Sequence, residues 1–275
     1  MNRMITRKLR EFAKELRDSI NKKISEEKLY ALKNKMLSTV YKMLVIHLGN
    51  PPESFDWQIR DKKKRFHRFK NLTPLSFFNE HVEIDLNELV CLINCPMSDK
   101  EYNKVYTVEF LGNVSEGNPI RYLNADIDIL KNAAIESLKN NDPVWFGCDV
   151  GKYLHRTHGV MDTKLFDFNL FYGTKFTLDK ASRLEYGESK MTHAMVFTGV
   201  DLDSKGKPKK WRVENSWGEK NGEKGYYIMS DDWFDQYLYE VVISKKYLEP
   251  NIIDLYENQD AKFLPPWDPM GALAK

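Results

Sequence analysis

The first fifty residues carry the helical periodicity of two amphipathic segments. Between positions 3 and 20, apolar residues recur every three or four positions with charges between them, which is typical of a helix with one packed face. A second stripe of the same period runs from 25 to 48. It starts at Ser25, which suits an N-cap, and stops at a Gly-Asn-Pro-Pro run. We therefore predict two helices and no catalytic group in either.

The next stretch mixes prolines, aromatic residues and charges. Residues 51–61 predict an ordered loop, and a basic run follows at 62–65. Thr73 as N-cap with Pro74 at the first helical position predicts a short helix over 73–81.

Short apolar runs separated by turn residues dominate the rest of the chain. Strands are predicted at 89–93, 106–111, 144–150, 225–229 and 238–244, with helices at 126–139 and 231–235. We expect an α+β fold: a mainly helical region over 1–104, a β-rich part over 105–250, and a C-terminal arm over 251–275. Prolines restrict the backbone of this arm, which we expect to pack on the surface through Phe263, Leu264 and Trp267.

A polar segment at 201–210 separates two apolar runs and predicts a β-hairpin with a long loop. If the turn is centred near residue 204, His193 faces Asn215 and Phe197 faces Trp211, all on one side of the hairpin. An imidazole beside a carboxamide suits a histidine that needs one ring nitrogen oriented while the other handles a proton.

Composition supports a folded protein. The chain has 275 residues, of which 42% are hydrophobic and 13% aromatic, enough for a sizeable core. The basic, amphipathic start does not match a secretory signal, and no stretch of about 20 apolar residues could span a bilayer. We therefore expect a soluble cytoplasmic protein.

Charge is unevenly distributed. The formal net charge is +2, yet residues 1–70 hold 19 Lys and Arg against 8 Asp and Glu. One interpretation is a pair of solvated helices and a basic loop. The other is a cationic surface for polyanions such as nucleic acid.

The three cysteines are expected to be reduced thiols. Cys91 and Cys95 could form half a zinc site, but no second pair with ligand spacing follows them, and the loop pair His155 and His158 lacks a third ligand. We expect neither a metal nor another cofactor. Cys148 lies in a predicted strand, where a cysteine is usually a small buried hydrophobe.

Several phrases resemble one family. T-H-A-M around His193, N-S-W-G from Asn215 and the following G-Y pair resemble the histidine and asparagine blocks of papain-like cysteine peptidases. MTHAM, KWRVENSWG, GNPPESFDW and PWDPMGALA resemble the bleomycin hydrolase and aminopeptidase C branch. The resemblance implies an incomplete papain-like fold that keeps the β-barrel half. It also implies a cysteine-type aminopeptidase, which hydrolyses peptides from the N-terminus through a thioester.

The resemblance also implies roles for individual residues. His193 would be the general base, Asn215 would orient it, and Trp217 would shield their hydrogen bond from water. The C-terminal arm, ending at Ala274 and Lys275, would enter the cleft and restrict substrates to free N-termini. Members of the family form hexameric rings, and some bind nucleic acid.

The sequence lacks the family's nucleophile block, G-x-C-W, and the oxyanion glutamine upstream of it. The chain alone is therefore predicted to be inactive. One hypothesis is a C-terminal portion of the enzyme or one part of a split enzyme, and a second is a non-catalytic oligomeric or nucleic-acid-binding descendant. A third is a compact enzyme using Cys148, although only 45 residues separate positions 148 and 193, whereas papain-like enzymes place about 130 to 150 between Cys and His.

Overall fold

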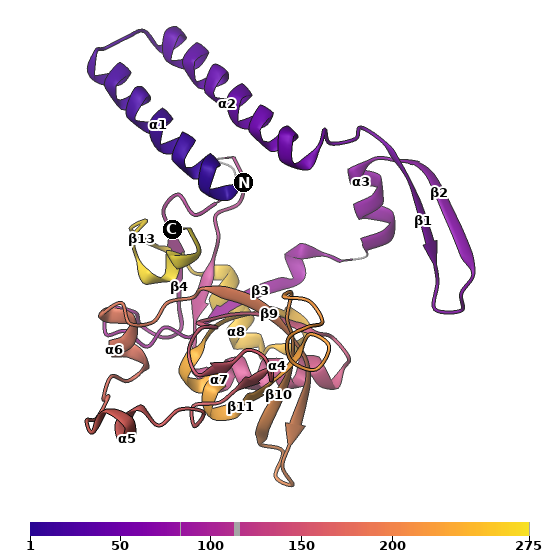
Figure 1. The fold of residues 1–275 in the computed structure, drawn as a ribbon, viewed down its shortest axis with the longest axis vertical. Coiled ribbons are helices and arrows are strands. Elements are labelled where there is room, and N and C mark those ends of the chain that lie inside the picture. The colour runs from indigo at the N-terminus through magenta and orange to yellow at the C-terminus, as the bar shows by residue number, and fades with distance from the viewer. Residues whose placement is uncertain (83, 113–115, 275) are drawn as a thin grey trace. The chain divides into compact units, whose positions relative to one another are not determined.

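The structure is a computed structural model that describes residues 1–82, 84–112 and 116–274, and the chain divides into two compact units (Figure 1). The units are Met1–Ile84 and Asp85–Lys275. This division falls earlier than the boundary predicted at residue 104, because strand β3 (Leu89–Ile93) is hydrogen-bonded inside the large sheet of the second unit. In the described part of the chain, no helix combines the length and apolar character needed to cross a bilayer.

Two helices form the start of the first unit, as predicted. They are α1 (Asn2–Asn21) and α2 (Glu26–Leu48). The Ser25 side chain caps α2 by accepting the Lys28 N–H, and Gly49, with φ of 80°, ends it. A positive φ is a conformation that glycine adopts without steric penalty, so Gly49 is a suitable terminator.

The rest of the first unit is a β-hairpin packed on a short helix, so the predicted loop over 51–61 was wrong. Strands β1 (Phe55–Arg60) and β2 (Phe66–Leu72) pair antiparallel. Trp57 stacks on Phe69 across the pair at 5.3 Å between ring centroids, and this aromatic cross-strand contact favours strands over loop. Helix α3 (Pro74–Phe77) begins at the predicted cap, Thr73, and continues as a π-helical turn over Phe78–Val82.

The second unit is built on a mixed sheet whose strand order is β13-β4-β5-β3-β12-β6-β9-β10-β11-β8-β7. Besides β3, its strands are β4 (Lys104–Val108), β5 (Tyr122–Asn124), β6 (Val144–Cys148), β7 (Leu154–His155), β8 (Val160–Met161), β9 (His193–Leu202), β10 (Pro208–Glu214), β11 (Tyr226–Ser230), β12 (Leu238–Ser244) and β13 (Lys262–Leu264). Its α-helices are α4 (Ile127–Lys139), α5 (Phe168–Tyr172), α6 (Lys180–Glu185), α7 (Asp231–Tyr237) and α8 (Pro250–Asn258). Short 3₁₀ turns lie at Leu86–Glu88, Lys245–Tyr247 and Pro269–Ala274.

An aromatic column crosses the middle of this sheet. Phe146 stacks on Phe197 at 3.9 Å between centroids, Phe197 contacts Trp211 at 4.9 Å, and Trp211 contacts Phe234 of α7 at 4.8 Å. All four side chains are fully buried. Burial of each such side chain stabilises the fold by roughly 1.5–3 kcal/mol, so this column holds β6, β9, β10 and α7 together.

The predicted hairpin exists, but its predicted register was wrong. Phe197 pairs with Val213 and Trp211 pairs with Val200, with a β-bulge between these pairs. The tight turn lies at Asp203–Lys207, because the Asp203 carboxylate accepts the N–H groups of Lys205 and Lys207. The turn is therefore centred later than residue 204. The predicted side-chain face survives, since Phe197 and Trp211 are still in contact.

The region predicted as a surface arm is largely structured. Residues 250–258 form α8, and β13 pairs parallel with β4. Of the three predicted packing residues, only Leu264 is buried, whereas Phe263 and Trp267 are 69% and 75% exposed. The predicted contacts of Phe263 and Trp267 were therefore wrong.

A partly buried ion pair joins α4 to α7. The Lys131 Nζ lies 2.6 Å from Asp231 Oδ2 and 2.7 Å from Asp235 Oδ1, and the Lys131 side chain is only 9% exposed. Burial opposes the charge of Lys131, but hydrogen bonds to both carboxylates outweigh it and raise the pKa of the ammonium. Asp231 also accepts the Trp211 indole N–H at 3.0 Å, which connects this pair to the aromatic column.

We expect Lys131→Met to lower the free energy of unfolding by about 1.5–3 kcal/mol, because it leaves two partly solvated carboxylates, 23% and 37% exposed, without their cation. Urea unfolding followed by circular dichroism measures the change. The control is Lys139→Met in the same helix, whose partner Glu136 and own side chain are both 52% exposed. We expect a loss below about 0.5 kcal/mol for the control, and equal losses for the two variants would contradict the assignment.

Candidate active site

His193 is the first residue of β9 and lies in the centre of the sheet. Strand β6 pairs with β9 on one side, and Cys148 is the residue directly opposite His193. Strand β10 pairs with β9 on the other side and leads to Asn215. The two strands that flank β9 thus bring three sequence-predicted candidates to one end of the sheet.

A buried carboxylate fixes the chain just before His193. Asp149, only 5% exposed, accepts hydrogen bonds from Ser189 Oγ at 2.8 Å and from Thr192 Oγ1 at 3.3 Å. The Ser189 hydroxyl is also 2.6 Å from the Tyr239 hydroxyl. This network was missed by the sequence reasoning. The sequence offers one indication of this network: Asp149 follows a predicted strand, and Ser189 and Thr192 come just before His193.

The predicted contact between His193 and Asn215 is present. Nε2 of His193 lies 2.9 Å from Oδ1 of Asn215, and Asn215 is only 8% exposed. An amide oxygen can only accept a hydrogen bond, so Nε2 carries the proton and Nδ1 of the neutral ring keeps a free lone pair. The carboxamide therefore orients the ring and leaves Nδ1 available to accept a proton.

Local backbone geometry places Asn215. Its N–H donates to the carbonyl oxygen of Gly225 at 3.1 Å, which closes the loop after β10. Gly225 has φ of +89° and Gly218 has φ of +79°, conformations that residues with a side chain rarely adopt. The glycines of the N-S-W-G and G-Y phrases thus shape the loop that presents Asn215.

Trp217 covers the histidine. Its indole lies 4.9 Å from the His193 ring, measured between centroids, and the rings are tilted by 31°. The Arg156 guanidinium lies 4.6 Å from the indole centroid, and Tyr227 contacts the indole edge-on at 6.2 Å. An aromatic cover lowers the local dielectric and strengthens the hydrogen bond beneath it. Arg156 and Tyr227 were not identified from the sequence.

Cys148 does not have the environment of a nucleophile. Its side chain is fully buried. Burial, and secondarily the charge of Asp149, raises the pKa of the thiol well above its usual value. Since the thiolate is the attacking species, this cysteine is chemically suppressed although it lies opposite His193.

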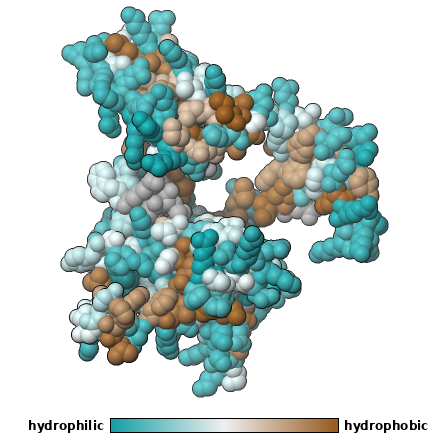
Figure 2. Space-filling view, viewed as in Figure 1, coloured by the Kyte–Doolittle hydropathy of each residue, from teal (hydrophilic) through white to brown (hydrophobic). Residues whose placement is uncertain are grey.

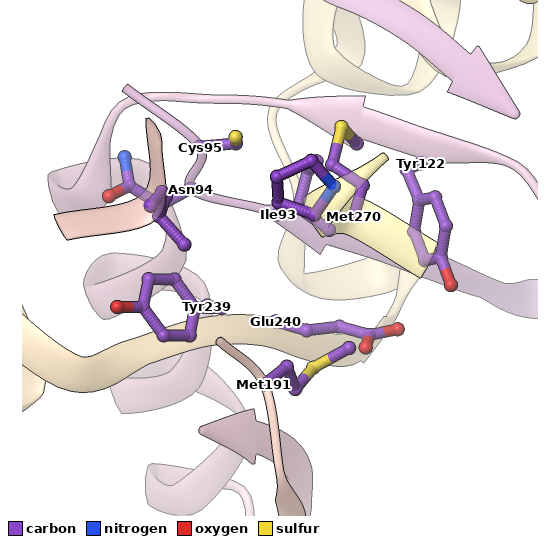
Figure 3. A pocket seen from close by; sticks show the side chains of 10 residues that line it. Ile93, Asn94, Cys95, Tyr122, Met191, Tyr239, Glu240 and Met270 are labelled. Carbon is purple, nitrogen blue, oxygen red and sulfur yellow. The ribbon is translucent and has the colours of Figure 1, made fainter. Parts of the chain in front are cut away.

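The C-terminal segment reaches the same region of the second unit. Met270 and Met191, which lies two residues before His193, line one small cavity together with Glu240 (Figure 3). Burial raises the pKa of Glu240 to about 7, and its Oε1 accepts the Cys91 thiol at 2.6 Å. Ala274 closes the last 3₁₀ turn, and Lys275 lies outside the described residues.

The metal candidates do not converge. Among the described residues, no three His, Cys, Asp or Glu side chains are grouped as metal ligands. The rings of His155 and His158 lie 4.4 Å apart, and the His158 N–H donates to His155 Nδ1, a local turn contact.

Comparison with known proteins identifies the class. A sequence model of the peptidase C1-like family matches residues 1–271, so the chain belongs to that family. Aminopeptidase C from Listeria monocytogenes is 43% identical over 274 residues, which make up 100% of this chain and 61% of that protein. Bleomycin hydrolase from Gallus gallus is 44% identical over 281 residues, again 100% of this chain and 61% of that protein.

A solved structure agrees in fold. The crystal structure of PepW from Lactobacillus rhamnosis has a TM-score of 0.94 and 50% identity, and the match covers 98% of this chain and 61% of that one. The predicted branch, bleomycin hydrolase and aminopeptidase C, is confirmed, as is the partial, papain-like α+β fold. The chain spans about three fifths of the length of these relatives.

We expect Cys148 to resist alkylation in the folded chain, because its thiol is buried and protonated. Iodoacetamide labelling followed by peptide mass spectrometry should detect modification of Cys148 only in urea, which serves as the positive control. Labelling of Cys148 in the native protein at neutral pH, at a rate comparable to that in urea, would contradict a buried, protonated thiol. It would support the hypothesis of a compact enzyme that uses Cys148.

Proposed function

We propose that this chain carries the base, its orienter and the specificity arm of a cysteine-type aminopeptidase, and that the nucleophile comes from a segment outside this sequence. The observation that carries the proposal is the 2.9 Å contact between His193 Nε2 and Asn215 Oδ1 beneath Trp217. The substrates would be peptides with a free N-terminus. The names of the relatives, aminopeptidase C and bleomycin hydrolase, support this class of reaction.

In this proposal Nδ1 of His193 accepts the proton of an incoming cysteine thiol, giving a thiolate and an imidazolium. The thiolate attacks the first peptide carbonyl, and the imidazolium returns its proton to the leaving amine as the C–N bond breaks. A water molecule then loses a proton to Nδ1 and hydrolyses the thioester, which releases the amino acid and regenerates the thiol. Asn215 holds the ring in one orientation through these transfers.

We expect the chain alone to lack peptidase activity and to gain it when a polypeptide carrying the family's nucleophile half is added. The assay measures release of a fluorophore from an aminoacyl substrate. His193→Ala should abolish the restored rate, because groups that act as a unit lose nearly everything when one is removed. Cys148→Ser is the matched control and should leave the rate unchanged. A restored rate that is indifferent to His193→Ala would refute the assignment of the base.

The C-terminal arm is proposed to limit cleavage to free N-termini. Its root is held by a buried ion pair, since Lys100 Nζ lies 3.0 Å from Asp268 Oδ2 and the two residues are 4% and 7% exposed. A Cβ added to Gly271 would lie 2.9 Å from Val108 Cγ1, so the segment is packed closely on β4. The end of the arm, Ala274 and Lys275, would offer its carboxylate to the α-ammonium of a substrate.

We expect removal of residues 271–275 to permit cleavage inside N-terminally acetylated peptides by the reconstituted assembly, because the group that blocks the cleft is gone. Mass spectrometry of the products distinguishes internal cuts from terminal ones. The intact chain in the same assembly is the control. If the truncated form still cleaves only free N-termini, the arm has a structural role alone.

A second candidate function is binding of polyanions by the first unit. The basic run 62–65 forms the turn of the β1–β2 hairpin, where the Asp61 carboxylate accepts the N–H groups of Lys63 and Arg65. Beside it, the guanidinium groups of Arg60 and Arg68 lie over Phe66, which is 51% exposed. This arrangement suits single-stranded nucleic acid, because the cations can contact its phosphates and the exposed ring can stack on its bases.

We expect the chain to bind single-stranded DNA at about 50 mM salt and to lose affinity steeply as salt rises, because phosphate contacts release counterions. Fluorescence anisotropy measures both. Replacing Lys62 and Lys63 with Glu should weaken binding at least about tenfold, whereas Lys205→Glu in the other hairpin turn is the control. Absence of binding at the lower salt would remove nucleic acid from the partners.

A further inference from the structure

A groove separate from the His193 site lies beside α5 in the second unit. Its volume is about 660 Å³, within the range of small-molecule and peptide sites. The lining combines aromatic and charged side chains and includes Tyr153, Phe168, Lys175, Phe176, Arg183 and Tyr237. Neither His193, Asn215 nor Trp217 lines it.

The walls of the groove are aromatic and unusually exposed. Tyr153 contacts Phe168 at 5.6 Å and Tyr237 at 5.9 Å between ring centroids, which forms a continuous apolar wall. Phe176 in the lining is 63% exposed, and Phe171 of α5, outside the lining, is 78% exposed. Figure 2 shows apolar residues gathered over this part of the second unit, at the lower left. Exposed apolar clusters of this kind mark binding surfaces.

The charges at the groove are unbalanced. Glu188 is already paired with Lys152, whose Nζ lies 2.7 Å from it. Within the described residues, neither Lys175 nor Arg183 has a carboxylate within 4.0 Å. Lys152, Lys175 and Arg183 line the groove together with one acid, Glu188, so the lining carries more positive than negative charge.

Arg183 is the more informative of these cations. Its guanidinium donates only to neutral oxygens: the carbonyl of Leu178 at 2.8 Å, and the carbonyl and side-chain oxygens of Gln236 at 3.1 and 2.7 Å. Its Nε is buried and has no hydrogen-bond partner among the described residues. Its guanidinium also lies 4.9 Å from the Tyr237 ring centroid, and after the hydrogen bonds from Ser182 its charge helps to lower the pKa of Asp179. An anionic ligand would add a second negative charge near this guanidinium.

One wall of the groove is the end of the sheet. Leu154 lines it and belongs to β7, the last strand in the sheet order. Among the described residues β7 pairs only with β8, so its outer edge is not used by another strand. An extended peptide can add to such an edge through its backbone while its side chains enter the neighbouring pocket.

We propose that this groove binds an extended peptide segment in which an aromatic side chain adjoins a carboxylate. The aromatic ring packs on Tyr153, Phe168 and Phe176, and the carboxylate lies near Lys175 and Arg183. The edge of β7 fixes the backbone. The occupant is a peptide ligand rather than a second copy of the chain, because a groove of about 660 Å³ with an aromatic and basic lining matches the size and chemistry of a short peptide.

The test uses two acetylated, amidated dipeptides, 4-fluorophenylalanyl-glutamate and 4-fluorophenylalanyl-glutamine, which differ only in charge. Their blocked N-termini prevent processing as aminopeptidase substrates. Fluorine NMR line broadening on titration with the whole chain gives both affinities. We expect the glutamate peptide to bind about fivefold more tightly, as removal of one partly solvated charge contact implies. Lys175→Gln should remove this preference.

The matched control is Lys164→Gln. Its side chain is 82% exposed, lies outside the groove and contacts Asp232 at 3.6 Å. This variant should keep the full preference for glutamate. Equal affinity of the two peptides for the unmodified chain, or no broadening at millimolar concentration, would overturn the proposal. Sedimentation could also overturn it, by showing a dimer that Phe171→Ser dissociates and that neither peptide dissociates. The surface would then be a contact between two copies of the chain.

Discussion

The pairing of β9 with strands on both sides is the constraint on which the candidate site depends. Phe146, Phe197 and Trp211 stack across β6, β9 and β10, and this column fixes the relative heights of the three strands. His193 and Asn215 sit at the same end of the sheet only because that register is fixed. A slip by one residue would turn the imidazole to the opposite face. The packing of the aromatic column therefore determines the geometry of the candidate site.

Side-chain hydrogen bonds convert this approximate placement into a defined one. Asp149 restrains the segment before His193, and the loop closed at Gly225 restrains Asn215. The backbone is therefore restrained at both His193 and Asn215. This restraint limits the conformational entropy that is lost when the imidazole is oriented. Cys148 lies opposite His193, but its thiol is buried, and burial raises the thiol pKa. A cysteine next to a histidine is therefore not a nucleophile unless its thiol can ionise.

Much of the fold and the central pair could be predicted because their signals are local. Amphipathic periodicity identified α1, α2 and α4, and the apolar runs identified β3 and β12. The register of the β9–β10 hairpin was missed because the Asp203 carboxylate, rather than loop length, sets the turn. Asp149 and Arg156 were missed for a different reason: their roles depend on partners distant in sequence, which periodicity does not register.

The parallel pairing of β13 with β4 orders events during synthesis. Lys262 pairs with Tyr106, so this edge of the sheet can form only after the segment around residue 262 has been synthesised. Contacts between such distant segments require closure of a long loop and therefore form late. The Lys100–Asp268 ion pair also forms only when β13 and the turn after it pack on β4. Before that, Lys100 is paired with Asp99 alone. The strands that carry His193 and lead to Asn215 all precede β13 in the chain, so their pairing does not require this edge of the sheet to be complete. A chain interrupted before residue 262 would leave the outer edge of β4 unpaired.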